Sequence, residues 1–148
     1  MKTLKDFLTE AVDINSALQE IVFIQDSGSM SNGKNKSLLK EFIEKDLDNP
    51  TLYSISGNGV KQIKSLKELK LDGPHFGASL LDECDKIISK IKHGQFYFII
   101  DGIFNDDLFD KFNELGNNHP NQISIEVISN DIKHIEQKLK SKIKVFKL

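Results

Sequence analysis

The sequence contains no arginine, and all 20 of its basic residues are lysines. Arginine supplies the planar guanidinium fork that reads guanine and binds phosphate through two parallel hydrogen bonds. Its absence argues against sequence-specific recognition of DNA. The formal net charge of −2 also gives the chain no general attraction to nucleic acid or to an anionic membrane surface.

Cysteine and long apolar runs are scarce as well. Cys84 is the only cysteine, so an internal disulfide is excluded. It falls at a core-facing position of an expected helix, which predicts a buried, inert thiol and a reducing compartment. No run approaches the ~20 apolar residues of a membrane span, and the N-terminus lacks the apolar core of a secretory signal. We therefore expect a cytoplasmic protein without a membrane partner.

The chain does have the length and mixed composition of one ordinary globular domain. It has 148 residues, of which 39% are hydrophobic and 28% are charged. A domain of this size buries roughly 68–70% of the surface that its unfolded chain exposes. We expect a single domain over residues 21–148, preceded by an N-terminal segment, Met1–Glu20.

The predicted fold is organised around Ile21–Met30, which reads IVFIQDSGSM. Its four apolar residues predict a strand that is buried on both faces, as in a parallel sheet covered by helices. Phe96–Gly102, FYFIIDG, has the same character. Both runs end in small or acidic residues, at the edge where open α/β sheets place their ligand crevice.

Strand-like and helix-like segments alternate along the rest of the chain. This alternation predicts an α/β fold with a doubly wound, mostly parallel sheet and helices on both faces. Gly57-Asn58-Gly59 predicts a hairpin at one edge. The expected strands are Ile21–Gln25, Thr51–Ser56, Val60–Leu66, Gln95–Asp101, Ile123–Ile128 and Ile143–Phe146. The expected helices end near Leu47, near Lys92 with Gly94 as a cap, at Leu115 before Gly116, and at Ser141.

The two buried stretches resemble the von Willebrand factor A family. Its metal-ion-dependent adhesion site opens with Asp-x-Ser-x-Ser, and Ser27-Gly28-Ser29-Met30 matches its Ser-Gly-Ser-Met. A later Asp-Gly of the family matches Asp101-Gly102. Gln25 stands where the family has its first acid, and Pro74 stands where it has a metal-binding threonine. The resemblance implies a Rossmann-type three-layer sandwich with the sheet order 3-2-1-4-5-6.

The resemblance also implies a degenerate metal site. Its candidate ligands are Ser27, Ser29 and Asp101, with Gln25 and Asp26 adjacent. Two hydroxyls and one carboxylate form a hard-oxygen set of the kind that suits Mg²⁺. Replacing the first acid by Gln25 removes a charge worth about several kcal/mol beside a divalent ion. We therefore expect no cofactor, or Mg²⁺ bound more weakly than millimolar.

Two classes of function fit this site. The favoured one is a non-enzymatic protein-interaction module of the von Willebrand factor A type, with Asp26, His75 and Asp101 as partner-binding residues. The alternative is a small metal-dependent hydrolase or phosphotransfer enzyme of another α/β family that uses Asp26 and Asp101. Converging carboxylates of these two residues would favour the enzyme, whereas Asp26 turned away would favour the adhesion site. The sequence has no phosphate-binding loop and no nucleophile elbow.

The N-terminal segment has two interpretations. Its apolar residues follow the spacing of an amphipathic helix that packs on the sheet, namely Leu4, Phe7, Leu8, Ala11 and Val12. Alternatively, MKTLKDFLTEA resembles the capsid-targeting peptides of internal head proteins in T-even-type tailed phages. Leu8-Thr9-Glu10 would then be the site cut by the prohead protease. This second resemblance implies a phage protein located in the bacterial host cytoplasm or in the virion interior.

Overall fold

The computed structural model describes residues 18–129, 132–139 and 142–148. The strands are β1 (Leu18–Gln25), β2 (Thr51–Ser56), β3 (Gly59–Ile63), β4 (His93–Asp101), β5 (Ile123–Ile128) and β6 (Ile143–Lys147). The helices are α2 (Gly33–Glu41), α3 (Ala78–Ser89), α4 (Asp106–Asn118) and α5 (Lys133–Lys138). Shorter helical turns are η1 (Gly28–Met30), η2 (Phe42–Asp46) and η3 (Leu66–Glu68).

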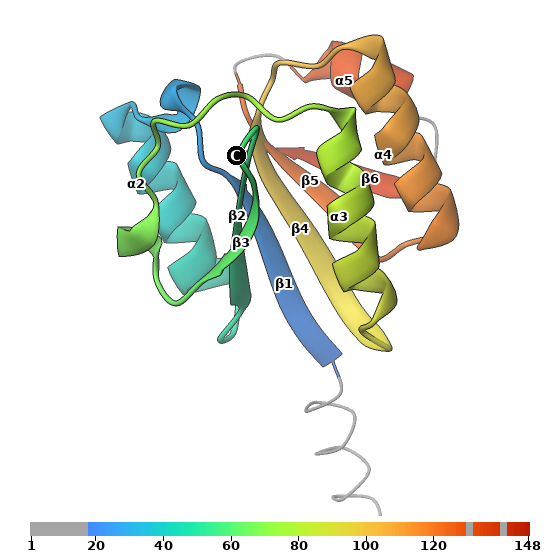
Figure 1. Cartoon of the computed structure of the whole chain (residues 1–148), viewed down its shortest axis with the longest axis horizontal. Helices are drawn as coiled ribbons and strands as arrows, with labels where there is room; N and C mark the ends of the chain where they lie inside the picture. Colours follow the sequence, from blue (N-terminus) through green and yellow to red (C-terminus); the bar gives the residue numbers. More distant parts are fainter. Residues whose placement is uncertain (1–17, 130–131, 140–141) are drawn as a thin grey trace, which may run out of the picture.

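The six strands form one sheet in the order β3-β2-β1-β4-β5-β6 (Figure 1). All neighbouring strands are parallel except β2 and β3, which form an antiparallel hairpin at one edge. The predicted α/β class, the mostly parallel sheet, the central place of Ile21–Gln25 and the edge hairpin at Asn58 are confirmed. A continuous apolar strand is favourable at the centre because both of its faces are covered.

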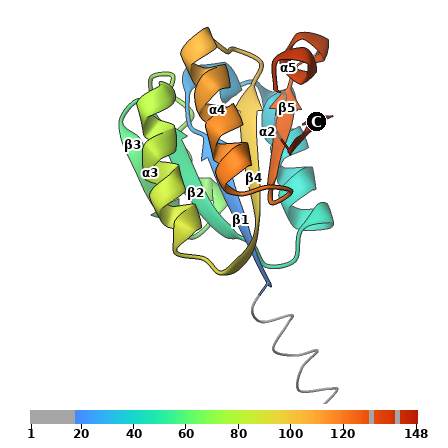
Figure 2. The ribbon, with the colours of Figure 1, turned by 90° about the vertical axis from the view of Figure 1, so that its right-hand side faces the viewer.

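Alternate residues of β1 belong to two separate hydrophobic cores, one on each face of the sheet. Ile21 and Phe23 belong to the larger core, with residues of α3, α4 and α5. Val22 and Ile24 belong to the smaller core, with residues of α2 and η2. Figure 2 shows α3 and α4 side by side on one face of the sheet and α2 on the opposite side. Side chains alternate between faces along a strand, so one apolar run serves both cores.

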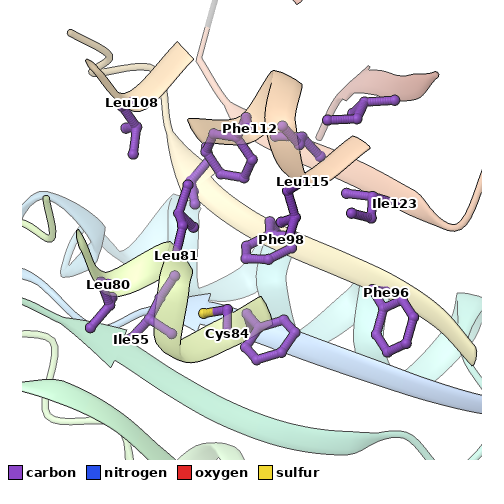
Figure 3. Close-up of a cluster of buried hydrophobic side chains, with 14 of the residues drawn as sticks. Ile55, Leu80, Leu81, Cys84, Phe96, Phe98, Leu108, Phe112, Leu115 and Ile123 are labelled. Carbon is purple, nitrogen blue, oxygen red and sulfur yellow. The ribbon is translucent and has the colours of Figure 1, made fainter. Parts of the chain in front are cut away.

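Aromatic rings form the centre of the larger core (Figure 3). The ring of Phe98 stacks on that of Phe23, with centroids 4.8 Å apart, and meets that of Phe112 edge-on at 5.2 Å. Cys84 of α3 is fully buried in the same core. Burial raises the pKa of the Cys84 thiol, with a smaller contribution from the charges of Glu83 and Asp85. The prediction that the Cys84 thiol is buried is confirmed.

Several element boundaries differ from those expected. Gly94 lies inside β4 and does not cap α3, which ends at Ser89. A Cβ at Gly94 would lie 2.5 Å from the ring of Phe96, so close packing requires this glycine. Helix α4 continues through the buried Gly116 to Asn118, beyond the end expected at Leu115.

The second strand of the hairpin is shorter than expected, since β3 ends at Ile63 and the turn η3 follows. Ser65 and Glu68 form a capping box at that turn, which ends the extended chain. β1 begins at Leu18, three residues before the expected start. The two interpretations of Met1–Glu20 concern residues 1–17, which lie outside the described residues. Within the described ranges, no helix is both long and apolar enough to cross a membrane.

Candidate functional site

The polar residues that follow β1 and β4 meet at the carboxyl edge of the sheet. Gln25 and Asp101 are the last residues of these neighbouring parallel strands. Ser27 lies two residues after the end of β1, and Ser29 lies in η1. The loop before α3 closes over this edge, with a bridge between Ser27 and Gly73. The predicted candidates Ser27, Ser29 and Asp101 are therefore brought together, as parallel strand ends require.

Gln25 is the centre of this cluster, and its side chain is fully buried. Its amide nitrogen Nε2 donates to Ser27 Oγ at 2.7 Å and to Asp101 Oδ2 at 2.8 Å, and it lies 3.3 Å from Ser29 Oγ. Its carbonyl Oε1 accepts from the backbone N–H of Asp101 at 2.9 Å. This last bond fixes the orientation of the amide, because only the oxygen can accept a hydrogen bond.

The hydroxyl groups complete a closed network around the amide. Ser29 Oγ donates to Asp101 Oδ2, because a carboxylate oxygen can only accept. Ser27 Oγ lies 3.0 Å from Ser29 Oγ. Because the Ser29 hydroxyl donates its hydrogen to Asp101, Ser27 is the donor in this second hydrogen bond. Each polar side-chain atom of Gln25, Ser27 and Ser29 thus has a partner within the cluster, which is what burial of polar groups demands.

The second oxygen of the Asp101 carboxylate, Oδ1, has its own partners outside the contacts with Gln25 and Ser29. Oδ1 accepts from the backbone N–H of Ile103 at 3.0 Å and lies 3.3 Å from His75 Nε2. The His75 ring stacks on Phe76, and its Nδ1 lies 2.9 Å from the Phe76 carbonyl oxygen. Ser29 and His75 are exposed polar residues of the cluster, and Ile103, whose backbone N–H bonds to Asp101, is 60% exposed.

Asp26 does not join the cluster. Its Oδ1 accepts from the backbone N–H of Leu71 at 2.6 Å, where Leu71 has a left-handed φ of 54°. Its backbone oxygen would lie 2.7 Å from a Cβ at Gly73, so this contact also requires a glycine in the loop. Asp26 therefore holds the loop that precedes α3. Pro74, in the same loop, accepts from the backbone N–H of Gly57 at 2.9 Å.

The residues present do not fit a metal ion bound as the family resemblance implies. A cation would have to lie among Ser27 Oγ, Ser29 Oγ and Asp101 Oδ2, and the Gln25 amide nitrogen already contacts all three oxygens. Its N–H groups would point at the cation, and an amide nitrogen offers it no lone pair. Among the described residues, no group of three or more His, Cys, Asp or Glu side chains could hold a metal ion.

Gln25 was predicted only as a lost acid, and its role as the hydrogen-bond donor at the centre was not predicted. A polar amide at the end of an otherwise apolar strand is the signal that could have indicated this role. Two residues outside the motif, Ile103 and Glu126, were not predicted either. Glu126 interrupts the apolar strand β5, and Ile103 is a bulky apolar residue in a loop. Comparison with known proteins adds no assignment, since no family model and no curated protein matches this chain.

Proposed function

We propose that this chain is a non-enzymatic protein-interaction module with the three-layer architecture of the von Willebrand factor A type, and that it binds its partner without a metal ion. The observation that supports this is the Gln25 amide nitrogen lying among the oxygens of Ser27, Ser29 and Asp101. The amide fills the place that the resemblance assigns to the cation. The Gln25 amide and the Ser29 hydroxyl both donate to Asp101 Oδ2, where the family's site would have a cation.

The exposed residues around the cluster suit a protein partner. The Ile103 backbone N–H bonds to Asp101 of the cluster and its apolar side chain is 60% exposed, while Ser29 and His75 are exposed polar residues of the cluster. A central apolar anchor with polar groups around it is the usual composition of an energetically important contact in protein interfaces. The resemblance of MKTLKDFLTEA to capsid-targeting peptides adds the proposal that the protein acts in a phage head or in the bacterial cytoplasm.

The alternative of a hydrolase or phosphotransfer enzyme has no geometric support. It required the carboxylates of Asp26 and Asp101 to converge. Asp26 instead bonds to the backbone of Leu71, while Asp101 bonds to Gln25, Ser29 and Ile103. Fold alone assigns no chemistry, so the α/β architecture by itself does not support an enzyme.

Replacing Ile103 by serine should weaken partner binding by about tenfold or more, the effect of losing a central anchor residue. The measurement uses the immobilised full chain to capture proteins from an extract of the native source, in a buffer that contains a metal chelator. The captured proteins are quantified by mass spectrometry. Phe146→Ser is the matched control, because Phe146 is the other large apolar residue with high exposure among the described residues.

The proposal requires a partner that the unmodified chain and the Phe146→Ser chain both retain in the chelator, and that the Ile103→Ser chain loses. Capture that disappears in the chelator would contradict the metal-free mode of binding. Equal capture by all three chains would contradict the location of the binding surface.

A further inference from the structure

A hollow lies on the α2 face of the sheet, over β1, β4, β5 and β6. Its volume is about 720 Å³, and its walls include Glu20 of β1, Tyr97 of β4, Glu126 of β5 and Phe146 of β6. All of these side chains share the face of Val22, Ile24 and Ile99.

Glu126 is a buried carboxylate in the wall of this hollow. The residue is 5% exposed. Ser124 Oγ donates to its Oε1 at 2.9 Å, and no described residue donates to its Oε2. Burial raises the pKa of Glu126 and the charge of Asp46 adds to this, while the Ser124 hydrogen bond opposes it. A buried carboxylate without a cation partner is costly, so the site favours a ligand that brings positive charge.

Glu20 supplies a second carboxylate whose position is fixed. Its Oε1 accepts from the backbone N–H of Asp48 at 2.8 Å, and its Oε2 accepts from the Tyr97 hydroxyl at 3.3 Å. Burial, followed by the nearby charge of Glu20, raises the pKa of Tyr97 to about 12. The hydroxyl therefore keeps its proton at neutral pH and continues to donate to Glu20.

Among the described residues, negative charge exceeds positive charge around the hollow. Glu20, Asp48 and Glu126 line it, and Lys144 is the one cation of the described ranges in its lining. No lysine or histidine nitrogen of the described residues lies within 4.0 Å of the Glu126 carboxylate. The ring of Phe146 is 49% exposed, and with Tyr97 it gives the hollow an aromatic lining.

The carboxylates of Glu20 and Glu126 lie too far apart to form one compact site. Glu20 and Glu126 lie on β1 and β5, with β4 between them. Two strand spacings separate them by about 10 Å across the sheet. They are also offset along the strands, because Glu20 pairs with Gln95 while Glu126 pairs with Ile99. A single divalent ion requires oxygen ligands at one point, whereas a linear ligand with separated charges can reach both.

We propose that this hollow binds a linear aliphatic polyamine, whose ammonium groups pair with Glu126 and Glu20 while its methylene chain lies over Tyr97 and Phe146. Ammonium groups interact favourably with carboxylates and with aromatic faces, and the methylene chain covers the apolar part of the lining. This inference does not depend on the proposed protein-interaction function, since no residue of the Gln25 cluster lines the hollow.

The test is calorimetric titration of the full chain with spermidine at constant ionic strength. We expect saturable binding with one spermidine per chain, and at least tenfold weaker binding by the Glu126→Gln and Glu20→Gln chains. Glu83→Gln is the control, because it removes the same charge from an exposed position on α3, over the opposite face. Its affinity for spermidine should equal that of the unmodified chain.

The Glu126→Gln chain should remain folded, because glutamine has nearly the same shape and removes a buried charge. The midpoint of its urea unfolding curve should therefore be equal or higher. Three results would overturn the proposal: spermidine binding without saturation, equal weakening by Glu83→Gln, and displacement of spermidine by Mg²⁺ at constant ionic strength. The first two would indicate general charge attraction, and the third would indicate a site for inorganic cations.

Discussion

Replacing Gln25 by leucine should lower the free energy of unfolding by about 3–5 kcal/mol, the range found when one partner of a buried charged network is removed. Leucine has a similar volume, so the change leaves little cavity and reports on the lost hydrogen bonds. The Asp101 carboxylate, the Asp101 backbone N–H and the Ser27 hydroxyl would each lose a partner in a buried site. Urea unfolding followed by circular dichroism measures the effect.

Gln62→Leu is the matched control for this change. Gln62 lies in the edge strand β3 and is exposed, so its replacement should alter stability by no more than about 0.5 kcal/mol. A loss below about 1 kcal/mol on Gln25→Leu would mean that the network contributes little to stability. The central place given to the Gln25 amide would then be wrong.

Replacing Phe98 by alanine should cost about 3–5 kcal/mol as well, but for a different reason. Phe98 is fully buried between Phe23 and Phe112, where all three rings interlock. Removing its ring deletes apolar contacts and opens a cavity that neighbouring β-strands cannot collapse to fill. The measurement is again the urea midpoint, with the slope of the transition compared between the chains.

Phe146→Ala serves as the control for the ring at position 98. The Phe146 side chain is half-exposed on β6, and its loss should change stability by no more than about 0.5 kcal/mol. Similar losses for both substitutions would contradict the position of the core between the sheet and helices α3 and α4.

Much of the fold could be predicted from the pattern of apolar residues. β1 and β4 are nearly continuous apolar runs, which place them at the centre of a covered sheet, and the Asn-Gly turn places the hairpin. The boundaries were less predictable because tertiary contacts decide them. Gly94 and Gly116 look like helix terminators in the sequence, yet both are buried, and Gly94 lies against the side chains of Ile91 and Phe96.

The candidate site could be predicted in location but not in organisation. Small and acidic residues at the ends of two buried strands indicated that Ser27, Ser29 and Asp101 would meet. The orientation of Gln25 depends on a hydrogen bond to the backbone of Asp101, 76 residues away. No local pattern encodes such a contact. The same holds for Asp26, whose carboxylate is turned away by a bond to Leu71 in a distant loop.

The amide at position 25 changes the electrostatic requirement of the site. A carboxylate there would stand close to that of Asp101, and two like charges in a buried site need a cation between them. Gln25 carries no charge and donates a hydrogen bond to Asp101. With the hydrogen bonds from Ser29 and from the Ile103 backbone, the single carboxylate of Asp101 is satisfied by hydrogen bonds alone. A site that is complete without an ion would present the same surface to a partner whatever the concentration of divalent cations.

Calorimetric titration of the full chain with Mg²⁺ tests this central claim most directly. The unmodified chain should show no saturable heat up to millimolar Mg²⁺, whereas Gln25→Asp should show stronger binding because it restores the acid of the family's motif. A tight, stoichiometric Mg²⁺ isotherm of the unmodified chain, abolished by Asp101→Ala, would contradict the account.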